Sequence, residues 1–189
     1  MGVNASVPEA QDLGLGAWTV DPCCTTLSGS FAAATLYLAA FYWRPGPGVN
    51  PFPQSVLIPN VLVGSWSAMQ VGIFNQDQVG QNAPGTLLAN STNVIPTAGI
   101  TVKPLTVVAA TAPAVLPAGR YWVGMVVTGT TGTAASTPNI LGAALGCNAG
   151  TDTAHMRFAT AATVTTVATF TPSGNTAAGA TLCLCACVL

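Results

Sequence analysis

The stretch Gly-Arg-Tyr-Trp-Val-Gly-Met-Val-Val, residues 119–127, decides the fold class of this chain. Most of it is β-branched or aromatic, and such residues suit a pleated, half-buried surface. Alternate positions of a strand share a face, which gives two sets: Tyr121, Val123, Met125 and Val127, and Arg120, Trp122, Gly124 and Val126. Both faces are largely apolar. The stretch therefore predicts a strand in the middle of a sandwich, or between a core and a partner subunit.

Further short strand patterns, bounded by Gly, Pro, Asn and Asp, recur along the chain. They are predicted at residues 16–20, 33–43, 54–63, 68–75, 86–90, 99–108, 155–160, 162–170 and 181–189, with a short apolar run at 139–145. The pair at 68–75 and 86–90 predicts a hairpin with a long connection. No segment of ten or more residues has a convincing helical period. The expected fold is all-β, a jelly-roll-like β-sandwich of about 8–10 strands.

The chain of 189 residues fits one domain. Residues 1–15 are polar and lack a sustained period, so they are predicted to form an extended N-terminal arm. Residues 16–189 are predicted to form a single β-sandwich domain. Within it, four prolines lie in residues 44–53, which predicts a stiff, exposed loop there.

Charged side chains are scarce: four basic and five acidic residues give a formal net charge of −1 at pH 7. A soluble protein of this length carries about 47 charged residues on average. Its folded surface is expected to be about 8,000 Å², or nearly 1,000 Å² for each charge in this chain. A free monomer with such a surface is poorly protected against association. We therefore expect a homo-oligomer, or a larger assembly that covers much of the surface.

The same composition excludes several partners. No basic stripe is present to neutralise phosphates, so nucleic-acid binding is not expected. The longest nearly unbroken apolar run, residues 31–43, is too short to span a bilayer. The N-terminus lacks the basic and apolar regions of a secretory signal.

Catalysis has little support in the sequence. His155 is the single histidine, the five acidic residues are scattered, and no two of them flank each other as a hydrolytic pair. No nucleophile elbow, phosphate loop or zinc-protease motif is present. We expect no enzyme, no catalytic residues and no cofactor.

Six cysteines are present: Cys23, Cys24, Cys147, Cys183, Cys185 and Cys187. The last three alternate with apolar residues, so on one strand their sulfur atoms would share a face about 7 Å apart, a poor spacing for disulfides. Three explanations are open. The first is a face that needs small apolar side chains, since Cys behaves as a small buried hydrophobe. The second is disulfides to the other cysteines or across a subunit axis, and the third is a metal site, although the spacing is not that of a zinc finger.

Tryptophan offers the other candidate site. The four are Trp18, Trp43, Trp66 and Trp122. Their rings could stack on sugars, and we take Trp43 and Trp66 as the candidates for a glycan-stacking surface. Packing in the core or at an interface is the commoner fate of Trp in a sandwich.

Several stretches, in this order and spacing, resemble structural proteins of tailed bacteriophages described as minor tail, tail-fibre, head-fibre or decoration proteins, common in phages of actinobacteria. The matching residues are 16–22, 71–75, 85–89, 116–124, 148–150 and 157–160. The resemblance implies a β-sandwich located in the virion, which assembles on the capsid or tail, often as a trimer.

Two functions of different class follow as expectations. The first is a structural virion protein, a capsid decoration or minor tail component, which associates with itself and with other virion proteins through apolar surfaces. The alternative is a carbohydrate-binding module that attaches the particle to a host-surface glycan. A binding module should expose aromatic side chains beside polar groups on a concave patch. The structural function predicts that aromatic side chains are buried within or between subunits.

Overall fold

The computed structural model describes residues 10, 15–19, 26–44, 51–61, 66–76, 84–93, 99–108, 110–129, 132–137, 158–170, 176–177, 183–184 and 186–189. Within these ranges the regular elements are β-strands, apart from the 3-10 helix η4 (Val167–Thr169) and Ala10, which is also in 3-10 conformation. Nine of the strands have five or more residues and five have two. The prediction of an all-β sandwich is confirmed, and the jelly-roll topology remains a prediction.

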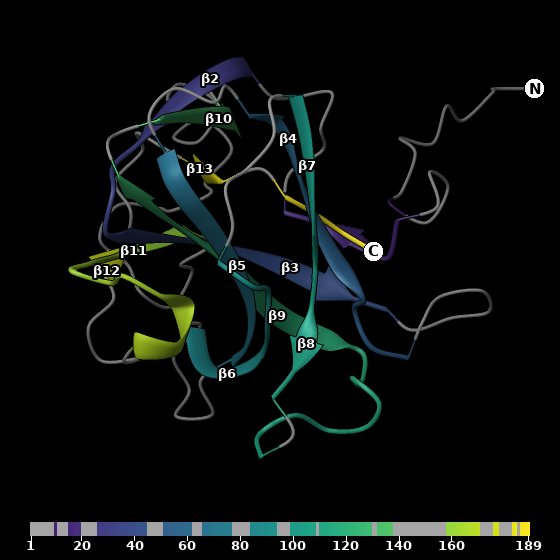
Figure 1. Cartoon of the computed structure of the whole chain (residues 1–189). Coiled ribbons are helices and arrows are strands. Elements are labelled where there is room, and N and C mark those ends of the chain that lie inside the picture. Colours follow the sequence, from purple (N-terminus) through teal and green to yellow (C-terminus); the bar gives the residue numbers. More distant parts are fainter. Residues whose placement is uncertain are drawn as a thin grey trace, which may run out of the picture.

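The largest sheet has seven strands in the order β12-β11-β3-β9-β5-β6-β8, and its pairs are antiparallel (Figure 1). Its middle strand, β9 (Gly119–Gly129), contains the stretch that predicted the fold. The predicted hairpin is confirmed as the β5–β6 pair. The other bounds are β3 (Thr35–Trp43), β5 (Trp66–Gln76), β6 (Pro84–Asn90), β8 (Thr106–Val107), β11 (Phe158–Ala162) and β12 (Thr176–Ala177).

Two smaller sheets complete the fold. One has the order β1-β14-β4-β7, and the other has the order β13-β10-β2. The bounds are β1 (Ala17–Trp18), β14 (Cys187–Val188), β4 (Ser55–Val61) and β7 (Gly99–Pro104) for the first sheet, and β13 (Cys183–Leu184), β10 (Gly132–Thr137) and β2 (Thr26–Phe31) for the second.

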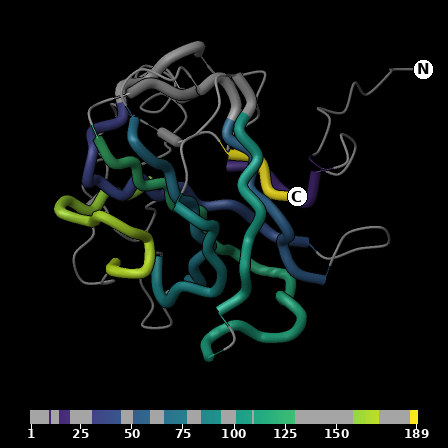
Figure 2. Tube along the Cα trace, viewed as in Figure 1, coloured from purple at the N-terminus to yellow at the C-terminus, as the bar shows by residue number. Residues whose placement is uncertain are grey.

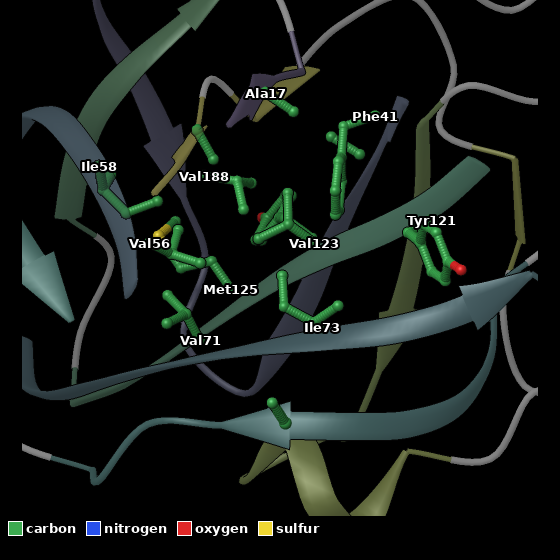
Figure 3. Close-up of a cluster of buried hydrophobic side chains, with 14 of the residues drawn as sticks. Ala17, Phe41, Val56, Ile58, Val71, Ile73, Tyr121, Val123, Met125 and Val188 are labelled. Carbon is green, nitrogen blue, oxygen red and sulfur yellow. The ribbon is translucent and has the colours of Figure 1, made fainter. Parts of the chain in front are cut away.

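The main core lies between the four-stranded and seven-stranded sheets. In Figure 3, Val56 and Val188 of the smaller sheet lie with Val123 and Met125 of β9 in one cluster of side chains. These side chains are at most 1% exposed. We call the side of the seven-stranded sheet that faces this core the inner face.

The opposite side of the seven-stranded sheet, here the outer face, carries a second core. Its members from the central strands are Leu36, Leu38, Ala40, Phe74, Trp122 and Val126. Residues 163–170, which include η4, cover them, and we call this segment the strap. Val164 and Val167 are buried against the outer face, and the Phe170 ring lies 5.3 Å from that of Phe74, edge to face. Figure 2 shows the strap (yellow-green) beside the strands.

A buried glutamine holds the strap. Gln70 of β5 is 7% exposed. Its Oε1 accepts a hydrogen bond from the Val167 N–H at 2.9 Å, and its Nε2 donates to the Ser91 carbonyl at 2.9 Å. The chain itself therefore buries both faces of β9 around Trp122, which answers the choice between a sandwich centre and a partner interface in favour of the former.

Two segments whose sequences did not predict strands form strands in the structure. Residues 132–137 look like Gly/Thr punctuation, yet they form β10, which pairs with β2, a strand that the sequence patterns did not predict. The pairing follows from position, because β2 precedes β3 and β10 follows β9, and β3 and β9 are already paired. Tertiary context overrides weak intrinsic preference at such places.

Two predictions about the later segments are wrong, and the prediction for the proline-rich segment is wrong in part. Residues 162–170 do not form the predicted strand. Ala162 is the last residue of β11, Thr163 has a φ of 60°, and the chain then turns into the strap. The predicted single strand 181–189 is divided between β13 and β14, which belong to different sheets. The predicted loop at 44–53 is irregular where it is described, with Arg44 and Pro51 exposed as expected, but near its end Phe52 is buried because it packs into the main core; residues 45–50 lie outside the described residues.

Other predictions fall outside the described residues. The N-terminal arm is represented by Ala10 and Leu15, where the Leu15 N–H donates to the Ala10 carbonyl at 3.0 Å. The apolar run 139–145 lies entirely outside. Within the described part of the chain, no helix has the length and hydropathy that crossing a membrane requires.

Candidate functional site

Trp43 and Trp66 do not form the glycan-stacking surface that we expected. Trp43 is fully buried and Trp66 is 3% exposed. Alternation along β3 directs the Trp43 ring to the inner face, and the register shift between Trp66 and Ala68 brings the Trp66 ring to the same face, where both join the main core. Neither indole N–H has a hydrogen-bond acceptor. A buried indole offers no face to a sugar, so the stacking role is withdrawn for these two residues.

The cysteine tail does not present three sulfur atoms on one strand. Cys183 begins β13, which pairs with β10, whereas Cys187 begins β14, which pairs with β1 and β4. Cys187 is buried, 3% exposed, as expected for a small apolar side chain. Cys23, Cys24, Cys147 and Cys185 lie outside the described residues. The disulfide and metal explanations for them remain untested.

The ionisable residues of the sequence are unevenly distributed. The five acidic residues and His155 all lie outside the described ranges, whereas Arg44, Lys103 and Arg120 lie inside them. Among the residues described, no three metal-ligating side chains come together. The expectation that the chain is not an enzyme therefore stays a prediction.

The structure instead assembles a basic and aromatic group at one end of the outer face. Tyr42 of β3 and Arg120 of β9 are cross-strand partners, and both follow the outer-face alternation. Such partners lie about 5 Å apart at Cβ. Arg44 lies two residues beyond Tyr42. We call Tyr42, Arg44 and Arg120 the outer-face triad.

Stacking positions both guanidinium groups of the triad. The Arg44 Cζ lies 5.3 Å from the centre of the Tyr42 ring, and the Arg120 Cζ lies 5.2 Å from that of Trp122. Cation–π attraction holds an arginine over a ring at such distances. Tyr42 is 54% exposed, Arg44 is exposed and Arg120 is partly buried. The result is an accessible tyrosine ring with Arg44 stacked on it and Arg120 opposite it on the neighbouring strand.

Sequence reasoning missed this group for an identifiable reason. The alternation of residues 33–43 places Tyr42 on the same face as Leu36, Leu38 and Ala40, which suggests burial. In the structure Tyr42 is 54% exposed, although Leu36, Leu38 and Ala40 on the same face are buried. Arg44 and Arg120, which follow and oppose Tyr42, could have indicated its exposure, because charged residues near an apolar strand usually lie where the strand reaches solvent.

Two further polar groups are fixed by burial. Lys103 of β7 is 3% exposed and lies opposite Val56, so it faces the main core. Burial lowers its pKa from the usual 10.5. The Tyr121 hydroxyl donates to the Pro117 carbonyl at 3.0 Å, and burial raises the pKa of this tyrosine above 10.0. Neither residue belongs to the triad.

One other stretch of the chain carries several exposed apolar side chains. Among the described residues, four large hydrophobic side chains are exposed, and three of them are Val102 (48%), Val107 (44%) and Val115 (55%). They come from β7, from β8 and from the loop that follows β8. In Figure 1, β7 continues directly into β8 and the loop. We call residues 102–115 the valine edge.

No protein-family model matches this chain, and no curated protein matches it. The resemblance to bacteriophage structural proteins is therefore neither supported nor contradicted by these comparisons.

Proposed function

We propose that this chain is a structural component of a bacteriophage virion, a capsid decoration or minor tail protein that associates with further copies of itself. The sequence resemblance supports a location in the virion, and the low charge of the surface supports self-association. The accessible surface is 8,900 Å² for nine charged side chains, about 1,000 Å² for each charge. Such a surface resists association poorly in solution.

The observation that carries the self-association is the valine edge. β7 ends the four-stranded sheet and β8 ends the seven-stranded sheet, and the two are consecutive in the chain. One short segment therefore forms an edge of both sheets among the described residues; Val102 and Val107 are exposed on it, and Val115 is exposed in the loop that follows. Exposed apolar patches of this kind are typical of contact surfaces between proteins.

The contact is expected to use side chains rather than strand addition. Pro104 lacks an N–H for a new ladder, and Lys103 points its charge inward along the same strand. Both features disfavour the pairing of one sheet edge with another. A second copy would therefore pack on the valine side chains, and a trimer is the arrangement that the resemblance favours.

The test is the oligomeric state measured by analytical ultracentrifugation. The wild-type chain is expected to form a defined oligomer. Replacement of Val102, Val107 and Val115 by lysine is expected to give a folded monomer, because three charges would then be buried in the contact. The matched control places three lysines at Ala162, Thr165 and Ala168, which are exposed on or beside the strap.

A wild-type monomer at high concentration would contradict self-association. Loss of the oligomer in both lysine variants would mean that added charge, and not the valine edge, decides the outcome. The virion location is tested separately, by gold-labelled antibodies against the chain on intact phage particles. Absence of label from particles of a phage that encodes the chain would contradict that location.

The alternative of a carbohydrate-binding module loses the residues on which it was based. Trp43 and Trp66 are buried, so neither ring supports it. Any such module would need an accessible ring elsewhere.

A further inference from the structure

The strap is a short cover with one side in solvent. It leaves β11 at Thr163 and contains η4. Val164 and Val167 are buried in the outer core. The exposed residues of the strap are Thr163, Thr165, Ala168 and Thr169. Buried and exposed positions therefore alternate along it, so one side faces the sheet and the other faces water.

The closed position of the strap requires an unfavourable backbone conformation at its start. Thr163 has a φ of 60°. A positive φ is rare for a β-branched residue, because its Cβ comes too close to the neighbouring carbonyl oxygen. Ala34, whose carbonyl accepts the hydrogen bond from the Val164 N–H at 3.0 Å, also has a positive φ, 53°. Such strain persists only where surrounding contacts impose it, so it would relax at Thr163 if the strap lifted.

A pair of glycines forms the seat of the strap. Gly72 of β5 lies opposite Gly124 of β9, and a Cβ at residue 72 would lie 3.1 Å from the Cγ2 of Val167. The glycine therefore lets Val167 approach the sheet closely. Gln70 accepts the hydrogen bond from the Val167 N–H, and η4 has no side-chain cap. A close approach at one glycine and a bond to one side chain thus position the turn.

The outer core contains a buried donor that the closed state leaves without an acceptor. The Trp122 ring is fully buried, and its indole N–H has no hydrogen-bond partner. Trp122 lies opposite Phe74, whose ring contacts that of Phe170 in the strap. A buried donor without a partner destabilises the state that buries it, because water would otherwise accept its hydrogen bond. The closed state therefore carries two costs, at Thr163 and at Trp122, that an open state would remove.

We propose that the strap is a lid on the outer face, which opens as one unit about Thr163 while the sheets stay folded. The open state exposes the cross-strand pair Phe74 and Trp122 and gives the Trp122 N–H a water partner. Burial of the apolar side chains of the strap keeps the closed state in the majority. Proteins open in such contiguous units at free energies below that of global unfolding. The lid works with or without self-association at the valine edge.

The experiment is hydrogen exchange of the full chain, followed by NMR at increasing urea concentrations below the unfolding transition. The amides of Val164 and Val167 should exchange through one opening with little dependence on urea, because that opening exposes little surface. The amides of Val123 and Met125 at the centre of β9 should exchange only through global unfolding, with a steep dependence on urea.

The buried indole N–H groups give a second, matched measurement. Trp43, Trp66 and Trp122 are all buried, and the indole groups of all three lack a hydrogen-bond partner. The first two lie in the main core and the third lies in the outer core. The Trp122 indole N–H should therefore exchange together with the strap amides, whereas those of Trp43 and Trp66 should exchange only with global unfolding.

Two variants shift the lid in opposite directions. Thr163→Gly removes the strain at the hinge and is expected to slow exchange of the strap amides about twofold to fivefold, since glycine also adds freedom to the open state. Gly72→Ala places a Cβ against Val167 and is expected to accelerate this exchange about fivefold or more. The Trp122 indole N–H should change by the same factor as the amides in each variant. Thr165→Ala, at an exposed position of the strap, is the control and should leave both rates unchanged.

Three results would overturn the proposal. The first is exchange of the strap amides with the same urea dependence as Val123, which would make the strap part of one global unit. The second is a Trp122 indole N–H that exchanges with those of Trp43 and Trp66, because something other than the strap would then cover it. The third is exchange in Thr163→Gly that is no slower than in the wild type, which would mean that Thr163 is not a strained hinge.

Discussion

The two faces of the seven-stranded sheet are buried by different means. A second sheet, with its own hydrogen-bonded ladder, closes the inner face, as the cluster in Figure 3 shows. An eight-residue strap closes the outer face, and a single glutamine side chain bonds its 3-10 turn to the sheet. The inner face is therefore covered by several strands at once, whereas the cover of the outer face among the described residues is the short strap. Tyr42, on the outer face, is 54% exposed.

The strongest test of this difference compares neighbouring residues on opposite faces. Trp43→Ala removes a fully buried ring from the inner core and is expected to lower the free energy of unfolding by about 3–5 kcal/mol. Tyr42→Ala, one residue earlier, removes an exposed ring from the outer face and should change stability by less than about 0.5 kcal/mol. Urea denaturation followed by tryptophan fluorescence and circular dichroism measures both.

The position of Gly16 agrees with the importance of the Trp43 ring. A Cβ at residue 16 would collide with that ring and lie 3.3 Å from the Val188 carbonyl oxygen. Equal losses for Trp43→Ala and Tyr42→Ala would contradict the division between a continuous inner core and an open end of the outer face.

The second prediction concerns the attachment of the strap. Gln70→Ala leaves the buried Val167 N–H and the Ser91 carbonyl without their side-chain partner. A buried polar group left without a partner costs about 1–3 kcal/mol, so we expect a loss of about 2–3 kcal/mol. Hydrogen exchange at Val167 should accelerate far more than exchange at Val123 on the central strand.

Gln54→Ala is the matched control for Gln70. Gln54 is exposed, and its Nε2 donates only to the nearby Phe52 carbonyl at 2.9 Å. Its replacement should cost less than about 0.5 kcal/mol. If exchange in the inner core rose as much as exchange in the strap, the two faces would form one cooperative unit, and the comparison above would be wrong.

The sequence predicted the parts of the fold that depend on strong local patterns. Residues 119–127 form the centre of β9, as their two apolar faces indicated, and Gly124 sits where Leu36 and Phe74 leave no room for a side chain. The hairpin at 68–75 and 86–90 followed in the same way from alternation and a loop between.

The parts that failed depend on partners distant in sequence. Residues 132–137 pair with β2 only because β9 has already paired with β3. The exposure of Tyr42 depends on which segments distant in sequence pack near it, and no local pattern in residues 33–43 contains that information. The cysteine tail alternates like one strand, yet its two ends belong to different sheets. The periodicity of a strand identifies its two faces, but it does not show which distant segments will cover them.

The third prediction concerns Lys103, whose side chain faces the main core. Burial lowers the pKa of Lys103 in the folded chain, so the unfolded chain binds more protons between that lowered pKa and 10.5. Stability contributed by this residue should therefore rise with pH across that window. Lys103→Met is expected to flatten the rise. The measurement is the free energy of unfolding against pH, kept below 10.0, where the raised pKa of Tyr121 would add an opposite slope.

The measurement on Lys103→Met also tests how completely the main core is closed at β7. A pH slope that is unchanged in Lys103→Met would mean that the lysine is hydrated in the folded state, and that the inner face is less closed at β7 than the burial of Lys103 indicates.

The smallest expected effect lies where the strap meets the turn between β2 and β3. Ala34 has a φ of 53°, its N–H donates to the Val127 carbonyl, and its carbonyl accepts from the Val164 N–H at 3.0 Å. A left-handed conformation is unfavourable for alanine and free for glycine, although glycine also adds entropy to the unfolded chain. Ala34→Gly is therefore expected to raise stability, by less than about 1 kcal/mol.

Ala33→Gly, at the neighbouring turn position without a positive φ, should lower it by about 0.5–1 kcal/mol. Thermal denaturation of the two variants side by side gives the sign directly, and a loss in Ala34→Gly as large as that in Ala33→Gly would show that this turn does not strain the attachment of the strap.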